Sequence, residues 1–261
     1  MERRTFLKAG VLAAAAAAVP LSACSSEGAP GAAGSSVPSA VKSGQWGFAI
    51  DVEKLNEAGV MDKIAQACHH AHNVPDTGDS KTEIKWIWEG DFEHSFSDID
   101  SEYASEHVAQ LGFPLLCNHC EEPPCVRLCP TEATFKRADG IVIMDYHRCI
   151  GCRFCMAGCP YGARSLNFSD PRPYLDDPNP DYPTRSKGVV EKCMLCSERI
   201  DEGQVPLCVE LSEGAIVFGD LTDPDSPVRK ALAGSFSIRR RVELGTGPSV
   251  YYLMKGGEEH A

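Results

Sequence analysis

The chain is organised by the stretch Cys149-Ile150-Gly151-Cys152-Arg153-Phe154-Cys155-Met156-Ala157-Gly158-Cys159-Pro160. Its cysteines follow the spacing C-x2-C-x2-C-x3-C-P, which puts three thiols on one tight loop and directs the fourth away from them. A related stretch lies upstream and reads Cys117-Asn118-His119-Cys120-Glu121-Glu122-Pro123-Pro124-Cys125-Val126-Arg127-Leu128-Cys129-Pro130. Its third cysteine comes two residues later, but the C-x3-C-P ending is the same.

This spacing is typical of [4Fe–4S] clusters in bacterial ferredoxins. In ferredoxins with two clusters, the fourth cysteine of each run ligates the cluster of the other run. Two adjacent runs of this kind therefore predict two clusters that exchange one ligand each.

The length, cysteine count and net charge of the chain limit the classes of function that it can have. The chain has 261 residues, enough for one large domain or two small ones. Its 13 cysteines suit disulfides in an exported protein or metal in a cytosolic one, and their spacing favours metal. The formal charge of −12 argues against nucleic acid and an anionic membrane surface as partners. Each oxidised cluster adds about two negative charges, which favours docking on a basic partner surface.

The N-terminus predicts export. Residues 2–8, with Arg3 and Arg4, resemble a twin-arginine signal, and the apolar segment 9–21 is too short to span a membrane. We predict a signal peptide at 1–23 and a flexible linker at 24–44, with the mature protein in the periplasm or on the outer face of the cytoplasmic membrane. Residues 21–24 resemble a lipobox, so Cys24 is a candidate for lipidation; ordinary cleavage near Ala23 is the alternative.

Sequence patterns predict short elements along the mature chain. They are strands at 46–52, 84–89 and 215–218, a helix over 53–71 that contains Cys68, a hairpin of 134–137 with 141–145, a loop over 170–184 and a helix-like segment over 193–201. The segment after Asp220 carries no clear chemistry. Its Arg239, Arg240 and Arg241 are expected to form a solvated charge run, with a docking patch as the alternative.

A third motif follows the two runs: Lys192-Cys193-Met194-Leu195-Cys196, then Arg199-Ile200-Asp201 and Cys208-Val209-Glu210. Together the three motifs resemble three of the four cysteine sets in the electron-transfer subunits of molybdopterin oxidoreductases, some hydrogenases and the Dsr complex. The resemblance implies an α+β fold over residues 45–261, made of two fused, loop-rich bacterial ferredoxin-like modules. One module, with two clusters, would span about 114–168, and the other, with one cluster, about 45–75 and 185–220.

The chain departs from this family in two places. Where the family has the first three cysteines of its first set, the residues after Val52, such as Leu55, Asn56 and Glu57, include none. Where the family has the last cysteine of its fourth set, this chain has Ser212. In the family these four cysteines hold one shared cluster. The resemblance therefore implies three [4Fe–4S] clusters instead of four.

The resemblance also implies how twelve of the thirteen cysteines are divided as cluster ligands. Site one comprises Cys117, Cys120, Cys125 and Cys159; site two comprises Cys149, Cys152, Cys155 and Cys129; site three comprises Cys193, Cys196, Cys208 and Cys68. Only Cys24 is left over, which agrees with a separate role for it.

Two other uses of these cysteines stay open. Structural zinc could explain Cys193 and Cys196 alone, but it explains two C-x3-C-P endings poorly. A disulfide scaffold is an alternative for an exported protein, although closely spaced cysteines rarely bridge each other. His69 and His119 lie beside candidate ligands, and we expect them to pack or hydrogen-bond instead of binding iron.

The sequence shows no nucleophile–base pair and no phosphate-binding loop, so we predict no catalytic residues. The expected function is single-electron transfer between an integral-membrane quinone-interacting subunit and a periplasmic redox subunit such as a multihaem cytochrome c. Among family members, residues 69–75 and 85–88 most resemble the iron–sulfur subunit of Dsr-type sulfur-metabolism complexes. The alternatives are a subunit of a molybdopterin sulfur-compound reductase or a periplasmic hydrogenase, and, in another class, a zinc- or disulfide-stabilised structural protein.

Overall fold

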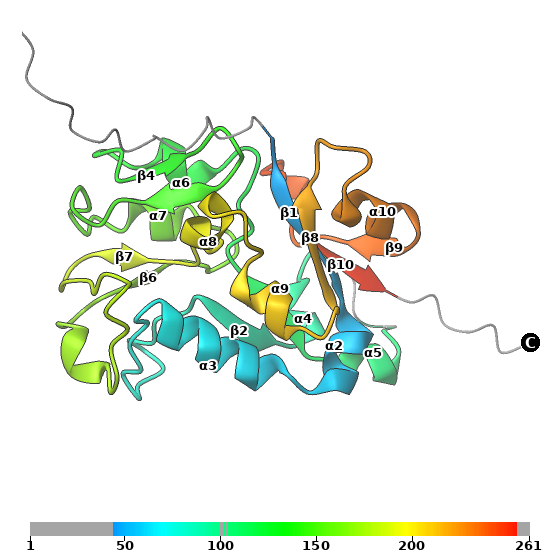
Figure 1. The fold of residues 1–261 in the computed structure, drawn as a ribbon, viewed down its shortest axis with the longest axis horizontal. Coiled ribbons are helices and arrows are strands. Elements are labelled where there is room, and N and C mark those ends of the chain that lie inside the picture. The colour runs from blue at the N-terminus through cyan, green and yellow to red at the C-terminus, as the bar shows by residue number, and fades with distance from the viewer. Residues whose placement is uncertain (1–43, 100–101, 103, 255–261) are drawn as a thin grey trace, which may run out of the picture. The chain divides into compact units, whose positions relative to one another are not determined.

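The computed structural model describes residues 44–99, 102 and 104–254. The predicted signal peptide, Cys24 and all but the last residue of the predicted linker lie outside these ranges. Within them the chain forms small sheets, short helices and long loops (Figure 1). This architecture agrees with the predicted α+β class.

The largest sheet joins the two ends of the described chain. Its strands are β1 (Trp46–Asp51), β8 (Ile216–Asp220), β9 (Phe236–Ile238) and β10 (Val250–Met254), in the order β8-β1-β10-β9. Strand β1 runs parallel to β10, with Phe48 opposite Val250, and antiparallel to β8. The sequence predicted β1 and β8. It did not identify β10, which lies inside the sheet and buries Tyr252.

The predicted helix over 53–71 is two helices, α2 (Val52–Ala58) and α3 (Met61–Ala71). Gly59 separates them with φ +62°, a conformation that glycine adopts without steric cost, and its N–H donates to carbonyls of the last turn of α2. At the other end of α2, the Asp51 side chain accepts from the Lys54 N–H. The break directs α3, and with it Cys68, along β2 and α9.

Three further sheets each consist of two antiparallel strands. They are β2 (Ile87–Gly90) with β3 (Phe113–Leu116), β4 (Thr134–Lys136) with β5 (Val142–Met144), and β6 (Ser165–Leu166) with β7 (Val190–Glu191). The hairpin predicted over 134–145 is confirmed. The strand predicted at 84–89 begins three residues later, at Ile87.

The other helices are one or two turns long. They are α4 (Phe92–Ser95), α5 (Glu106–Gln110), α6 (Pro124–Arg127), α7 (Phe154–Ala157), α8 (Ser197–Asp201), α9 (Leu207–Leu211), α10 (Pro227–Ala233) and the 3-10 turns η1 (Arg172–Tyr174) and η2 (Val242–Leu244). None of the helices in the described part of the chain combines the length and apolar character needed to cross a bilayer.

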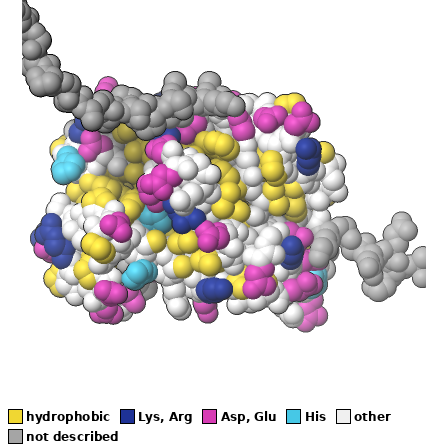
Figure 2. Space-filling model, in the orientation of Figure 1, with side chains coloured by type: hydrophobic (Ala, Val, Ile, Leu, Met, Phe, Trp, Pro, Cys, Tyr) yellow, Lys and Arg dark blue, Asp and Glu magenta, His cyan; other side chains and the backbone are white. Residues whose placement is uncertain are grey.

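One arginine of the predicted charge run is buried, so the prediction was wrong for Arg240. Its side chain is 6% exposed, and Nε donates to the Ser95 carbonyl at 2.9 Å. The guanidinium also lies over the Tyr161 ring, with Cζ 5.5 Å from the ring centroid. Arg240 follows β9 directly, and β9 pairs with β10 in the main sheet. This pairing places an arginine that the sequence suggests is exposed in the interior. On the face seen in Figure 2, acidic side chains are scattered over many elements, as the net charge leads one to expect.

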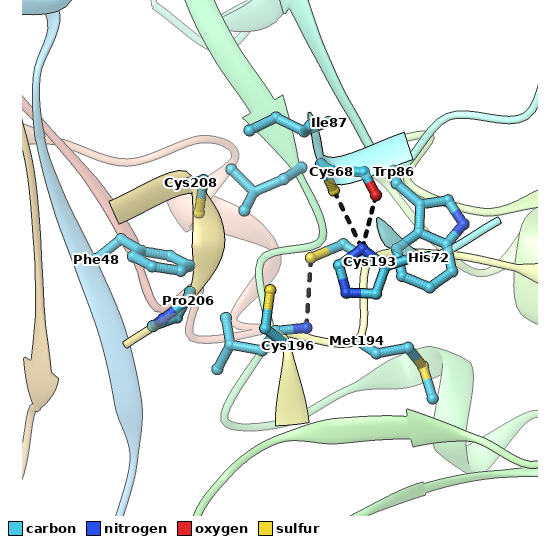
Figure 3. Close-up of a pocket in the computed structure, with 12 residues that line it drawn as sticks. Phe48, Cys68, His72, Trp86, Ile87, Cys193, Met194, Cys196, Pro206 and Cys208 are labelled. Atoms are coloured by element: carbon cyan, nitrogen blue, oxygen red, sulfur yellow. Dashed lines mark hydrogen bonds between the residues drawn. The ribbon is translucent and has the colours of Figure 1, made fainter. Parts of the chain in front are cut away.

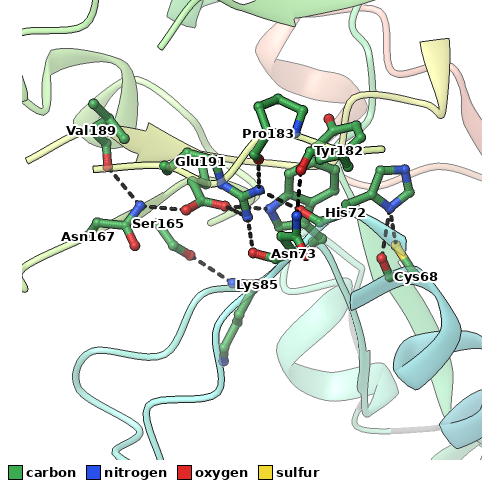
Figure 4. Close-up of polar contacts among 12 residues, drawn as sticks. Cys68, His72, Asn73, Lys85, Ser165, Asn167, Tyr182, Pro183, Val189 and Glu191 are labelled. Carbon is green, nitrogen blue, oxygen red and sulfur yellow. Dashed lines mark hydrogen bonds and ion pairs between the residues drawn. The ribbon is translucent and has the colours of Figure 1, made fainter. Parts of the chain in front are cut away.

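A buried ion pair connects the loop after η1 with β7 (Figure 4). Arg185 Nη2 lies 2.5 Å from Glu191 Oε2, and both side chains are fully buried. Arg185 also donates to the carbonyls of His72 and Asn73, and Glu191 accepts from Trp86 Nε1 at 3.2 Å. The network therefore attaches the end of α3 to the 183–191 segment.

We expect Arg185→Met to lower the free energy of unfolding by about 3–5 kcal/mol, because Glu191 would be left as an unpaired buried charge. The matched control is Arg172→Met, which breaks an exposed pair with Asp170 and should cost at most about 1 kcal/mol. Urea unfolding of the cluster-loaded protein under argon measures both. An equal loss of unfolding free energy in the two variants would show that the buried pair stabilises the protein no more than an exposed pair does.

Candidate iron–sulfur sites

The first C-x2-C pair of each of the three cysteine motifs shares one backbone feature. The residue before the second cysteine is left-handed in each: His119 has φ 39°, Gly151 66° and Leu195 61°. Such a turn folds the chain back, so that neighbouring N–H groups point toward one side and form a concavity that suits anions. At the third pair, the Leu195 N–H lies 3.4 Å from Cys193 Sγ. The local fold thus directs backbone donors at sulfur.

The two long runs also match beyond their third cysteine. Leu128 follows α6 and Gly158 follows α7 as the C-terminal cap residue, and both have φ −87° and ψ −6°. Three residues after the last cysteine of each run comes a left-handed residue, Glu132 (φ 53°) or Gly162 (φ 65°). The two helices pack against each other. Each helix therefore carries the third cysteine of its run and is followed closely by the fourth cysteine.

The four cysteines of site one line a single cavity, together with Val142, Tyr161 and Arg164. Cys117, Cys120 and Cys125 come from the earlier run and Cys159 from the later one. The structure thus places the fourth cysteine of one run with the first three of the other.

Polar groups around site one suit an anionic occupant. Arg164 Nη2 donates to Cys125 Sγ at 3.0 Å. His119 Nδ1 accepts from the Val142 N–H, so Nε2 carries the proton, yet Nε2 is buried without a hydrogen-bond partner among the described residues. Burial raises the pKa of Cys117, but His119, Lys192 and Arg164 outweigh this effect and hold it well below its usual value.

The four cysteines of site three also surround one cavity, which Phe48 and Pro206 help to close (Figure 3). Cys68 lies on α3 and Cys208 on α9, and these helices pack together. Cys193 and Cys196 come from the turn before α8. All four side chains are buried. Burial holds the pKa of Cys193 and of Cys208 well above the usual value, so ionisation of these thiols needs a nearby cation or metal.

A buried histidine adjoins site three. His72 Nδ1 donates to the Cys68 carbonyl at 2.7 Å and lies 3.7 Å from Cys68 Sγ. Its Nε2 lies 3.0 Å from Glu198 Oε1. Both ring nitrogens face acceptors, so the imidazole is protonated. Burial alone would lower the pKa of His72, but Cys196, Cys68 and Glu198 together raise it to about 12.

Site two lies nearest the surface. Cys155 is buried on α7, whereas Cys129, Cys149 and Cys152 are half-buried. Cys155 interacts electrostatically with Cys149 and with Arg164; burial raises its pKa and Arg164 opposes the rise. Cys129 follows α6, which packs on the helix that carries Cys155. The structure therefore brings α6 and the 149–155 loop together at this site.

The positions at which the family holds its fourth cluster are filled by other structure in this chain. Ser212 is fully buried; its Oγ donates to the Val209 carbonyl at 2.8 Å and accepts from the Ile216 N–H at 3.1 Å. The segment that lacks cysteines forms α2, which buries Val52 and Leu55 in the core. Helix α2 thus uses as packing surface the segment in which the family has cluster ligands.

The donor sets of sites one and three fit a cubane cluster. Each offers four thiols around one cavity, with N–H donors directed at sulfur. All twelve described cysteines are free thiols. A disulfide scaffold would require several of them to be paired.

These features define an iron–sulfur protein of the ferredoxin class. Residues 108–170, which include the cysteines of sites one and two, match the 4Fe-4S dicluster domain family.

Relatives with known names extend the match to most of the chain. It is 40% identical over 235 residues to the Hdr-like menaquinol oxidoreductase iron-sulfur subunit 1 of Archaeoglobus fulgidus, covering 82% of this chain and 85% of the relative. It is 34% identical over 234 residues to the menaquinone reductase iron-sulfur cluster-binding subunit of Nitratidesulfovibrio vulgaris, covering 81% and 89%. It is 32% identical over 248 residues to the arsenate respiratory reductase iron-sulfur subunit ArrB of a Shewanella species, covering 82% and 98%.

The chain therefore belongs to the family of iron–sulfur subunits of menaquinol and molybdopterin-type oxidoreductases. It is an electron-transfer subunit that binds [4Fe–4S] clusters.

Sequence reasoning assigned no role to three charged residues beside the sites. Lys192 opens the third cysteine motif, Arg164 lies just after the Cys149–Pro160 run, and His72 follows His69 and His70 closely in the sequence. Lys192 directly precedes Cys193, and Arg164 follows Cys159-Pro160 by four positions. The sequence shows that both basic residues lie close to cysteines. Only the structure shows that they are buried and where they lie relative to the cavities.

We expect Ser212→Cys to leave the iron content unchanged, because the new thiol would have no partner ligands and its position is used for two backbone hydrogen bonds. The same loss of hydrogen bonds should lower stability by about 1–3 kcal/mol, and Ser212→Ala should cost a similar amount. Iron and sulfide analysis with urea unfolding measures both effects. A gain of about four iron atoms in Ser212→Cys would contradict this account.

Proposed function

We propose that the chain carries three [4Fe–4S] clusters, one at each of sites one, two and three. The observation that carries the proposal is the grouping of cysteines from distant segments around two cavities, four thiols in each. A bound cubane supplies one-electron chemistry by cycling between its 2+ and 1+ states. The protein supplies four thiolates per site, buries seven of the eight cysteines of sites one and three, and directs N–H groups at sulfur.

Site two is the proposed point of exchange with a partner, since its ligands are the most exposed. Ile150 and Phe154, between its cysteines, are 67% and 58% exposed. Exposed apolar side chains next to redox ligands suit a docking contact. The residues would belong to two fused ferredoxin-like modules: about 114–168 with sites one and two, and about 45–75 with 185–220 for site three.

Metal analysis tests the cluster count. Anaerobically purified protein should contain about 12 iron and about 12 acid-labile sulfide per chain. A brown colour and an EPR signal after reduction should accompany them. About eight of each would mean that one site is not filled, and zinc without sulfide would rule out electron transfer.

We further propose that this subunit serves a Dsr-type membrane complex. It would pass single electrons between an integral-membrane quinone-interacting subunit and a periplasmic redox subunit, such as a multihaem cytochrome c. Two relatives with long matches carry menaquinol or menaquinone in their names, which supports a quinone-linked partner. The match to an arsenate respiratory reductase subunit favours the second candidate, service to a molybdopterin reductase.

The proposed location is the outer face of the cytoplasmic membrane. It rests on the twin-arginine motif at Arg3 and Arg4 and on Cys24 as a lipidation candidate. Clusters are inserted before export on this route, because the twin-arginine system carries folded proteins. A lipid at Cys24 would anchor the protein through the linker that follows.

The native complex, purified from membranes, tests partner and location together. We expect an integral-membrane subunit and a multihaem cytochrome c to copurify, and mass spectrometry to find a mature N-terminus at or near residue 24. A molybdopterin subunit in place of the cytochrome would support the second candidate. A functional protein that still begins at Met1 would contradict removal of a signal peptide during export.

A further inference from the structure

Two cations are buried among the cysteine sites without acidic partners. Lys192 is 0% and Arg164 is 5% exposed. Among the described residues no carboxylate pairs with either, whereas the buried Arg185 has Glu191. An unpaired buried cation is costly, so each needs another source of negative charge. Thiolates and the clusters that they hold would supply it.

Lys192 lies between sites one and three. Its Nζ donates to the carbonyl of Val142, which lines the cavity of site one. The same Nζ donates to the carbonyl of Cys193 at 2.8 Å, and Cys193 lines the cavity of site three. One ammonium group is thus held by the walls of both cavities.

Arg164 lies between sites one and two. Its guanidinium lines the cavity of site one and donates to Cys125 Sγ at 3.0 Å and to Thr134 Oγ1 at 2.9 Å. Cys125 lies on α6, which packs on α7, the helix that carries Cys155 of site two. Sites one and three therefore share Lys192 as a buried cation, and sites one and two share Arg164.

We infer that Lys192 and Arg164 act as fixed positive charges between neighbouring sites, each raising the reduction potential of the two clusters that it separates. This inference rests on the proposed assignment of clusters to the three sites. Reduction adds one negative charge to a site, and a nearby buried cation favours that charge in a medium of low dielectric constant. Because each cation serves two sites, it stabilises the electron on either side of a transfer. Site one is affected by both residues.

Redox titration followed by EPR tests the inference on the intact protein. Signals are first assigned with Cys120→Ser, Cys152→Ser and Cys208→Ser, one ligand from each site. In Lys192→Met we expect the one-electron reduction constants of sites one and three to fall at least about tenfold, or about 59 mV, with site two unchanged. In Arg164→Met we expect the same fall at sites one and two, with site three unchanged.

Three variants serve as controls. Lys192→Arg and Arg164→Lys keep the charge and should retain potentials near those of the unmodified protein. Lys187→Met removes an exposed lysine close in sequence and should shift no site. Iron and sulfide are measured for every variant before titration.

The outcomes separate this inference from the proposed function. An unmodified protein without about 12 iron would refute the three-cluster assignment itself. Three clusters whose potentials do not move in the Met variants would refute the role of the cations alone. A Met variant could lose clusters. Loss only at the two sites beside the substituted residue, while Lys192→Arg or Arg164→Lys keeps its clusters, would support the inference. Loss that the charge-keeping variant shares would indicate a packing role and overturn it.

Discussion

The exchange of one cysteine between neighbouring runs constrains the rest of the structure. Cys159 reaches the cavity of the earlier run because α6 and α7 pack together and end with the same backbone geometry. That packing requires the β4–β5 hairpin to return the chain between the two runs. Site three depends on the same principle at longer range, because Cys68 and Cys208 meet only when α3 packs on α9. The helices are short, and their main task is to position thiols.

Buried charge follows from buried thiols. Burial disfavours thiolate, as the raised pKa of Cys193 and of Cys208 shows. The structure offsets this cost with buried cations near the thiols: Lys192 and Arg164, which have no carboxylate partner among the described residues, and His72, which also pairs with Glu198. Neither group would be stable in the interior alone, and together they form sites that suit a negatively charged inorganic group.

The segments in which the family has the ligands of a fourth cluster have another structural role in this chain. Helix α2 occupies the segment that carries ligands in related proteins, and it contributes Val52 and Leu55 to the core. Ser212 completes a turn with two backbone hydrogen bonds. Strand β1 leads directly into α2, and α2 contacts β10.

The sequence by itself determined the ligand chemistry, since the spacing of cysteines within a run is a local property that the turn between them requires. It also indicated the α+β class, the 134–145 hairpin and the missing set. Only the tertiary structure decided which distant segments meet. Strand β10 and the buried Arg240 could not be predicted, because their burial depends on pairing with β1 and contact with Ser95. The same holds for Lys192, which becomes a cation between two sites only when the fold places Val142 beside it.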